Sequence, residues 1–277
     1  MTIHKPKNLL TIKFLKRMIT SLIFIYLSFA IYIYFQADSM IFLPPPSTYQ
    51  DTNEIIKLNS EDGTKLSAIH LLNPKAKYTV LYAHGNASDL GTIRPKLEQL
   101  KTIGFSVFAY DYRGYGTSEG KPSEKNAYKD IDTAYNYLTQ KLNIPPQQII
   151  VFGRSVGGGS AIDLAARKPV AGLITESTFI SAFRVKVPFP LLPFDRFPNL
   201  EKIKRVKCPV LIMHGKVDDI VPFYHSETLF EQAPPPKLSL WIEEANHNDF
   251  TYVAGERYVK ILKEFMELVD QHINTQL

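Results

Sequence analysis

The chain has 277 residues with 32 Lys and Arg, 27 Asp and Glu, and one cysteine. That cysteine, Cys208, excludes an intramolecular disulfide, and no cluster of potential ligands has zinc or iron spacing, so we expect no metal and no cofactor. The net charge of +5 lies wholly before residue 18, which leaves the remainder neutral and gives no indication of nucleic-acid binding.

The N-terminal segment has the pattern of a membrane anchor. Five basic residues and no acidic one precede an uncharged, apolar run at residues 18–37, which at about 1.5 Å per helical residue can cross a bilayer core of about 30 Å. The run exceeds a signal-peptide core of about 7 to 15 residues. The basic residues are Lys5, Lys7, Lys13, Lys16 and Arg17. We expect a cytoplasmic N-terminus (1–17), a single-pass signal anchor (18–37) and a catalytic domain on the opposite side of the membrane.

Beyond the anchor, Leu43-Pro44-Pro45-Pro46-Ser47 indicates a short polyproline linker within residues 38–50, and residues 51–277 suit one α/β domain. Strand and helix patterns alternate there, which predicts a mostly parallel sheet flanked by helices, with the active site at the carboxyl ends of the strands. The expected strands are residues 55–58, 66–72, 79–84, 105–112, 149–152, 171–176, 210–214 and 238–243. The expected helices are residues 92–102 and 123–141, one ending near 167, and one beginning at 222.

The motif Gly153-Arg154-Ser155-Val156-Gly157 joins the fifth expected strand to a helix of small residues. Glycines on both sides of the serine permit a tight turn that holds Ser155 in a strained conformation above the sheet. This pattern is typical of a nucleophile elbow. We predict that Ser155 forms an acyl-enzyme, which water then hydrolyses.

In chains with such an elbow, an acid and then a histidine follow the serine. Four histidines follow Ser155, and His247 is the best placed because it lies in a polar loop between a strand and the C-terminal helix. We interpret the others as structural, since His214 ends a strand, His225 falls at a helix start and His272 lies in a polar tail.

The loop after the seventh expected strand supplies two acids, Asp218 and Asp219. We favour Asp218, whose carboxylate can accept a hydrogen bond from His247, fix the tautomer of its imidazole and stabilise the imidazolium. Asp219 suits a helix cap. Glu176, at the end of the sixth strand, is an alternative acid, whereas Asp111 is expected to hold loops by ion pairing.

Two backbone amides are expected to form an oxyanion hole. The amide of Val156 follows the nucleophile at a helix N-terminus, where the dipole also favours negative charge. The loop His84-Gly85-Asn86-Ala87 has the sequence position of the second donor, for which we favour the amide of Asn86, with Ala87 as the alternative.

Residues 179–207 form an apolar insertion broken by prolines and carrying scattered cations. We interpret it as a small cap that borders the acyl pocket, the alternative being ordinary packing beneath a loop. Contact of Phe189 and Leu192 with lipid headgroups would suit a lipid or acylated substrate.

Four motifs in this order make the chain resemble the α/β-hydrolase superfamily, and more narrowly the membrane-associated α/β-hydrolase-domain proteins that include protein depalmitoylases. The motifs are His84-Gly85-Asn86-Ala87, residues 111–120, residues 153–159 and Asn246-His247-Asn248-Asp249. The resemblance covers about residues 40–269 and implies Ser155, Asp218 and His247 as the triad. Those depalmitoylases have a cysteine-rich, lipid-modified N-terminus, which this chain lacks, so its anchoring must differ.

The sequence therefore predicts a membrane-anchored serine hydrolase, of class EC 3.1, that cleaves an ester or thioester in a small-molecule, lipid or acylated-protein substrate. One alternative is a serine peptidase or amidase, in which His247 protonates an amine leaving group. Another is a non-catalytic, membrane-bound α/β-hydrolase-like scaffold, which is disfavoured because all three triad residue types occur in order.

Overall fold

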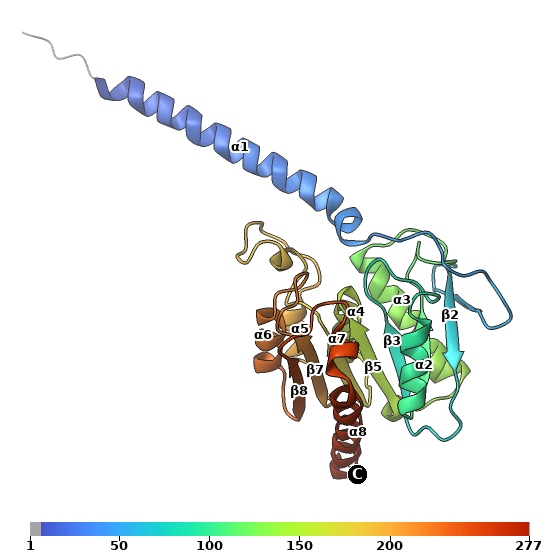
Figure 1. Cartoon of the computed structure of the whole chain (residues 1–277). Helices are drawn as coiled ribbons and strands as arrows, with labels where there is room; N and C mark the ends of the chain where they lie inside the picture. Colours follow the sequence, from blue (N-terminus) through green and yellow to red (C-terminus); the bar gives the residue numbers. More distant parts are fainter. Residues whose placement is uncertain (1–6, 277) are drawn as a thin grey trace, which may run out of the picture. The chain divides into compact units, whose positions relative to one another are not determined.

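A computed structural model describes residues 7–276, with side chains from 12 to 275, and divides into two compact units, Met1–Met40 and Ile41–Leu277 (Figure 1). Lys5, part of the predicted cytoplasmic flank, lies outside the described residues, as does the side chain of Lys7.

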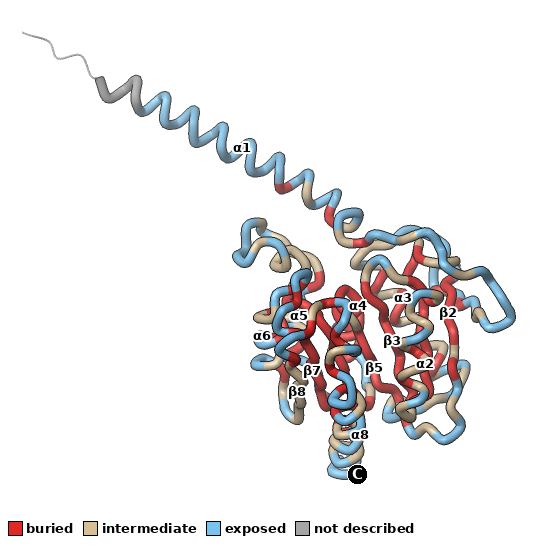
Figure 2. Tube along the Cα trace, in the orientation of Figure 1, coloured by how far each residue is buried: buried red, intermediate tan, exposed pale blue. Residues whose placement is uncertain are grey.

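The first unit is helix α1 (Lys7–Ile41), which includes the predicted anchor. Its portion Ile12–Ile41 is long and apolar enough to cross a membrane, a test that signal sequences near an N-terminus also pass. Most residues of this portion are exposed (Figure 2), and they include large apolar ones such as Phe24, Ile25 and Phe35. A helix that presents Leu, Ile and Phe on all sides is not the amphipathic helix of a water-soluble surface.

The second unit is built on an eight-stranded sheet of order β1-β2-β4-β3-β5-β6-β7-β8. The strands are β1 (Ile56–Asn59), β2 (Lys65–Leu71), β3 (Thr79–Ala83), β4 (Ser106–Tyr110), β5 (Ile149–Arg154), β6 (Gly172–Glu176), β7 (Val210–Gly215) and β8 (Lys237–Ile242). β1 and β2 pair antiparallel with their neighbours, and all pairs from β4 to β8 are parallel. The predicted mostly parallel sheet is confirmed.

Helices cover both faces of this sheet (Figure 1). They are α2 (Arg94–Ile103), α3 (Glu124–Asn136), α4 (Val156–Arg167), α5 (Asn199–Ile203), α6 (Tyr224–Gln232), α7 (Phe250–Ala254) and α8 (Glu256–Gln276). Buried residues of α2, α7 and α8 pack in one core cluster, and those of α3 to α6 pack in another. The expected helix at residues 123–141 is α3 continued by a π-helical turn, Tyr137–Lys141.

The two core clusters divide the strand residues by alternation. In β4, Val107 and Ala109 belong to one cluster, whereas Phe108 and Tyr110 belong to the other. A strand covered by helices on both faces has no polar face to show, which explains why the central strands read as continuous apolar runs. Only the strand ends and their loops remain for polar, functional side chains.

The second unit begins at Ile41, whereas the sequence pattern placed the catalytic domain from residue 51. Phe42 is buried, and its ring lies 6.3 Å from that of Tyr112, 6.5 Å from Tyr115 and 6.0 Å from Phe197. The proline-rich segment that follows α1 is thus attached to the domain by a buried aromatic side chain. The run of prolines in the sequence predicts a linker and does not indicate this attachment.

Candidate active site

Ser155 lies in the turn between β5 and α4 with φ 52° and ψ −120°, a conformation that L-residues rarely adopt. The flanking glycines are required by close approach. A Cβ at Gly157 would collide with the carbonyl oxygen of Ala83, and one at Gly153 would collide with the backbone of the first turn of α4. The turn therefore closes only with glycine at both positions, as the elbow pattern predicts.

Three side chains predicted as a triad meet at this turn. Nε2 of His247 lies 3.1 Å from Oγ of Ser155, and Nδ1 of His247 lies 2.8 Å from Oδ2 of Asp218. They come from three separate strand ends, after β5, β7 and β8, which the parallel sheet places at one edge. All three are nearly buried, so water competes little for their hydrogen bonds.

The Asp218 carboxylate is held in its ionised form. Burial would raise its pKa, but contacts with His214 and His247 and the amide of Val221 outweigh burial and keep the pKa well below the usual range. Oδ1 accepts hydrogen bonds from the amides of Ile220 (3.0 Å) and Val221 (2.8 Å), which fix the carboxylate plane. The charge is thus available to orient His247.

His214 contacts the same carboxylate, a role that its position at a strand end did not predict. Its Nε2 lies 3.1 Å from Oδ2 of Asp218 and 2.9 Å from the carbonyl oxygen of Val221, and its Nδ1 lies 2.6 Å from Oγ of Ser226. The sequence feature that could have predicted this contact is the four-residue spacing from His214 to Asp218, with a glycine at the strand end between them. His225 lies apart from the triad, with Nδ1 accepting the amide of Ile180 at 3.3 Å.

Glu176, the alternative acid, is engaged elsewhere. Its carboxylate lies 3.0 Å from Nζ of Lys96 and 3.4 Å from Nε of Arg154, and it is almost fully buried. Burial would raise the pKa of Glu176, but the charges of Lys96 and Arg154 lower it more. A carboxylate neutralised by two cations is poorly suited to stabilise an imidazolium as well.

Arg154, the residue before the nucleophile, connects two catalytic loops. Its Nη2 donates to the carbonyl oxygen of His247 at 2.8 Å and to Oδ1 of Asn248 at 2.9 Å. The same guanidinium pairs with Glu176 at the end of β6. Apart from its place in the elbow motif, no sequence pattern singles out this arginine.

The loop after β3 lies against the nucleophile. A Cβ at Gly85 would stand 3.5 Å from Cβ of Ser155. The amide of Ala87, the alternative oxyanion donor, already donates to Oδ1 of Asn86 at 3.0 Å. Of the two candidate amides in this loop, that of Asn86 therefore fits the predicted role better, together with that of Val156 at the first turn of α4.

A second histidine and aspartate meet behind this loop. Nε2 of His84 lies 3.1 Å from Oδ1 of Asp111, at an angle outside hydrogen-bonding range, and both side chains are fully buried. Nδ1 of His84 pairs with the carbonyl oxygen of Gly85 at 2.8 Å. Asp111 accepts hydrogen bonds from the Tyr49 hydroxyl (2.5 Å) and the Leu90 amide (3.0 Å), so it holds loops together through hydrogen bonds with neutral groups rather than through the expected ion pairing.

Within the expected cap, residues 179–207, a loop is closed by Asp195. Its carboxylate accepts hydrogen bonds from Oγ of Ser181 (2.7 Å) and the amide of Phe183 (2.8 Å). At the tip of the loop, the side chains of Phe189 and Leu191 are exposed, and Leu192 is half-buried. The cap therefore has apolar side chains in contact with solvent.

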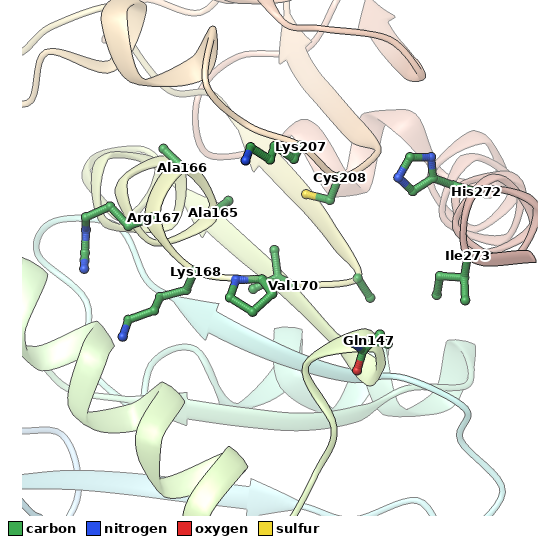
Figure 3. Close-up of a pocket in the computed structure, with 12 residues that line it drawn as sticks. Gln147, Ala165, Ala166, Arg167, Lys168, Val170, Lys207, Cys208, His272 and Ile273 are labelled. Atoms are coloured by element: carbon green, nitrogen blue, oxygen red, sulfur yellow. The ribbon is translucent and has the colours of Figure 1, made fainter. Parts of the chain in front are cut away.

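A cavity of about 410 Å³ lies at the opposite edge of the sheet, near the starts of β5, β6 and β7 (Figure 3). Its lining includes Lys168, Cys208 and His272 but no predicted catalytic residue. Burial raises the pKa of the Cys208 thiol to about 12, so it stays protonated at neutral pH. Among residues 7–276, no three His, Cys, Asp or Glu side chains are grouped to hold a metal ion.

Comparisons with known proteins agree with this fold. Residues 74–194 match the family model described as serine aminopeptidase, S33. The chain is similar in fold to the esterase Pf2001 of Pyrococcus furiosus, with 22% identity, a TM-score of 0.68 and coverage of 82% of this chain and 97% of that one. The esterase Est1E of Butyrivibrio proteoclasticus is also similar, with 22% identity, a TM-score of 0.65 and coverage of 78% and 99%. The likeness to these structures shows the α/β-hydrolase fold that the sequence motifs predict.

Sequence relatives define the family more closely. The chain is 37% identical to α/β-hydrolase domain-containing protein 17B of Xenopus tropicalis, over 84% of this chain and 92% of the relative. It is 36% identical to the human protein 17B with the same coverage. The chain belongs to this family of α/β-hydrolase domain-containing proteins.

Proposed function

We propose that the protein is a serine hydrolase in which Ser155, His247 and Asp218 form a catalytic triad that cleaves a carboxylic ester or thioester of an acyl group. The observation that carries the proposal is the continuous contact from Asp218 through His247 to Ser155, with distances of 2.8 and 3.1 Å, at a strained strand-to-helix turn. This is the arrangement in which an imidazole activates a hydroxyl nucleophile.

In the first half of the reaction, Oγ of Ser155 attacks the carbonyl carbon while Nε2 of His247 takes the hydroxyl proton. The carbonyl π electrons move to oxygen, and the oxyanion is stabilised by the amides of Val156 and Asn86. Collapse of the tetrahedral intermediate breaks the bond to the alkoxide or thiolate leaving group, which takes the proton from His247. The acyl-serine then reacts with water by the same steps and releases the acid.

Asp218 supports both half-reactions without changing its own protonation. Its carboxylate holds Nδ1 of His247 as the protonated nitrogen, which leaves Nε2 to accept the serine proton, and its charge stabilises the imidazolium. The lowered pKa of Asp218 keeps this charge present throughout the pH range in which a histidine can act as a base.

We further propose that residues 18–37 of α1 form a signal anchor, with residues 1–17 cytoplasmic and the catalytic domain, residues 51–277, on the opposite side. Residues 38–50 join the two, and from Ile41 onward this segment belongs to the same compact unit as the domain. The length and apolar character of α1 and the basic residues that precede its apolar run support this topology. Protease treatment of sealed membrane vesicles of known orientation tests this topology. Protection of the C-terminal domain from a protease on the cytoplasmic side is expected, and its digestion there would overturn the orientation.

The proposed substrate is an acylated small molecule, lipid or protein. Its support is the resemblance to proteins that include depalmitoylases, together with the exposed Phe189 and Leu191 of the cap. A second candidate reaction is amide or peptide cleavage, which the match to the serine aminopeptidase model favours. Initial rates on an ester, a thioester and an amide of the same acyl chain distinguish the two.

Labelling of the full-length, detergent-extracted protein by a fluorophosphonate probe tests the proposed nucleophile. We expect labelling of the wild type, none of Ser155→Ala, and normal labelling of Ser160→Ala, a matched change to a buried serine one and a half turns along α4. Absence of labelling in a folded wild type would contradict the proposed hydrolase and favour the alternative of a non-catalytic scaffold.

A further inference from the structure

Residues 41–49, here called the strap, follow the helix α1 and lie on the catalytic domain without forming regular secondary structure beyond Ile41. Three consecutive prolines, Pro44 to Pro46, remove backbone donors from the middle of this segment. The strap nevertheless makes hydrogen bonds at both ends, and Phe42, at its first end, is buried. Two side chains of the loop at residues 84–89, Asn86 and Asp89, take part in these hydrogen bonds.

The first attachment is the side chain of Asn86. Its Oδ1 accepts the amide of Leu43 at 2.9 Å, and its Nδ2 donates to the carbonyl oxygen of Ile41 at 2.6 Å. One carboxamide thus pairs with the strap backbone on both sides of Phe42. Oδ1 also accepts the Tyr115 hydroxyl at 2.6 Å, so the whole amide group is fixed in orientation.

The other attachments lie at the far end of the strap. The amide of Thr48 donates to Asp89 at 2.6 Å, and its Oγ1 donates to the same carboxylate at 2.5 Å. The hydroxyl of Tyr49 donates to Asp111 at 2.5 Å. Asp111 in turn lies against His84, so the strap is bonded to the loop or its support at both ends.

The loop that receives these bonds is strained. Ala87 has φ 53°, in the left-handed region, directly after Asn86. Such a conformation in a residue with a Cβ persists only when its surroundings over-determine it. The Oδ1 of Asn86 accepts the Ala87 amide and the strap amide of Leu43 together, which joins the strap to the strained residue.

We infer that the strap is a positioning element for the oxyanion hole: through the Asn86 side chain it holds the Asn86 amide in the orientation that receives the oxyanion formed at Ser155. This inference rests on the proposed serine-hydrolase function. The strap does not touch the reacting atoms, and it acts through the loop. Catalysis thereby depends on the chain segment that directly follows α1, rather than on a free linker.

The test uses Leu43→Pro in the full-length protein, which deletes the one strap amide that donates to Asn86. The matched control is Leu43→Ala, which keeps that amide and shortens a side chain that is 57% exposed. Losing one hydrogen bond of typical strength corresponds to roughly a five- to tenfold effect, so we expect kcat of Leu43→Pro to fall about tenfold with KM within about twofold. Leu43→Ala should match the wild type.

A second variant and a second readout guard against simple misfolding. Thr48→Val removes the hydroxyl bond to Asp89 at constant volume, and we expect a smaller fall in kcat, about threefold to fivefold. A trifluoromethyl ketone forms an oxyanion on its serine adduct, so its inhibition constant should rise in both variants by the factor by which kcat/KM falls. A strap that only stabilises the fold would lower the melting temperature and leave both quantities unchanged.

Three results would overturn the inference: unchanged kcat in Leu43→Pro and Thr48→Val, equal losses in Leu43→Pro and Leu43→Ala, or a weaker ketone complex unrelated to kcat/KM. Fluorophosphonate labelling of the wild type separates these outcomes from failure of the proposed function. If the wild type is labelled at Ser155 and the strap variants behave as wild type, the positioning role alone is wrong.

Discussion

At the carboxyl edge of the sheet, two buried aspartates, Asp218 and Asp111, each lie beside a histidine, and only the pair of His247 and Asp218 reaches the proposed nucleophile, Ser155. In the pair of His247 and Asp218, one imidazole nitrogen faces the carboxylate and the other faces Oγ of Ser155. In the pair of His84 and Asp111, the second nitrogen is taken by the carbonyl oxygen of Gly85.

The two pairs show that residue type and burial do not by themselves make a base. A backbone carbonyl has no proton to give, so the imidazole of His84 can only hold the loop together. A serine hydroxyl can give its proton, and the neighbouring carboxylate then stabilises the charge that results. What the second nitrogen faces distinguishes these two pairs. It does not define a base by itself, because His214 also contacts Asp218 and its other nitrogen lies 2.6 Å from Oγ of Ser226, which is buried in α6.

The largest expected difference between the pairs comes from alanine substitutions of the two histidines. His247→Ala should lower kcat by about 10⁶-fold, as removal of a triad base does, with little change in melting temperature. His84→Ala should lower the melting temperature by several degrees, because it leaves a cavity and removes the imidazole that lies beside the buried Asp111. Its effect on kcat should be far smaller than that of His247→Ala. Steady-state kinetics and thermal melts of both variants test this, and similar losses of kcat would contradict the comparison.

Asp218→Asn should lower kcat about 10⁴-fold, because an amide in place of the carboxylate favours the wrong imidazole tautomer. Asp219→Asn, a change to the exposed neighbouring residue, is the matched control and should keep kcat within about threefold.

Glu176→Gln addresses the alternative acid. It breaks a buried ion pair with Lys96, so a loss of stability of about 3 to 5 kcal/mol is expected, measured by denaturant unfolding. A loss of kcat as large as that of Asp218→Asn, in folded protein, would make Glu176 the acid.

A smaller effect is expected for Arg154→Gln, which removes the bonds that hold the His247 loop beside the elbow. Because misplacement of a base by about 1 Å can cost about 100-fold, we expect kcat to fall about 10- to 100-fold with KM little changed. Arg154→Lys, which keeps the charge near Glu176, should recover part of this loss. A change confined to KM would instead indicate that Arg154 binds substrate.

The smallest effect concerns another buried imidazole, that of His225. Burial lowers its pKa to about 4, against about 6.5 in an unfolded chain. As pH falls from about 6.5 to 4, His225 therefore binds a proton in the unfolded state but not in the folded state. The stability that is present above pH 6.5 is lost over this range. Thermal melts across this range should show a steeper decline for the wild type than for His225→Gln, and parallel curves would contradict the prediction.

The sequence by itself determined the parts of the site that depend on local pattern. Glycines at 153 and 157 around a serine, after an apolar strand and before small residues, specify a turn that only glycine permits, because the backbones of Ala83 and α4 approach too closely for any Cβ. The apolar runs specified the central strands, since strands covered on both faces have no polar side. The order of serine, acid and histidine then limited the choice to a few residues.

Only the tertiary structure decided which of those residues meet. Whether Asp218 or Glu176 faces His247 depends on contacts made across adjacent strand ends, where Lys96 and Arg154 engage Glu176. The contact of His214 with Asp218 also escaped the sequence pattern. The attachment of Asn86 to the strap joins residues more than forty positions apart. Spacing along the chain predicts what one turn or strand can do, but hydrogen bonds between distant loops exist only after the sheet has brought those loops to one edge.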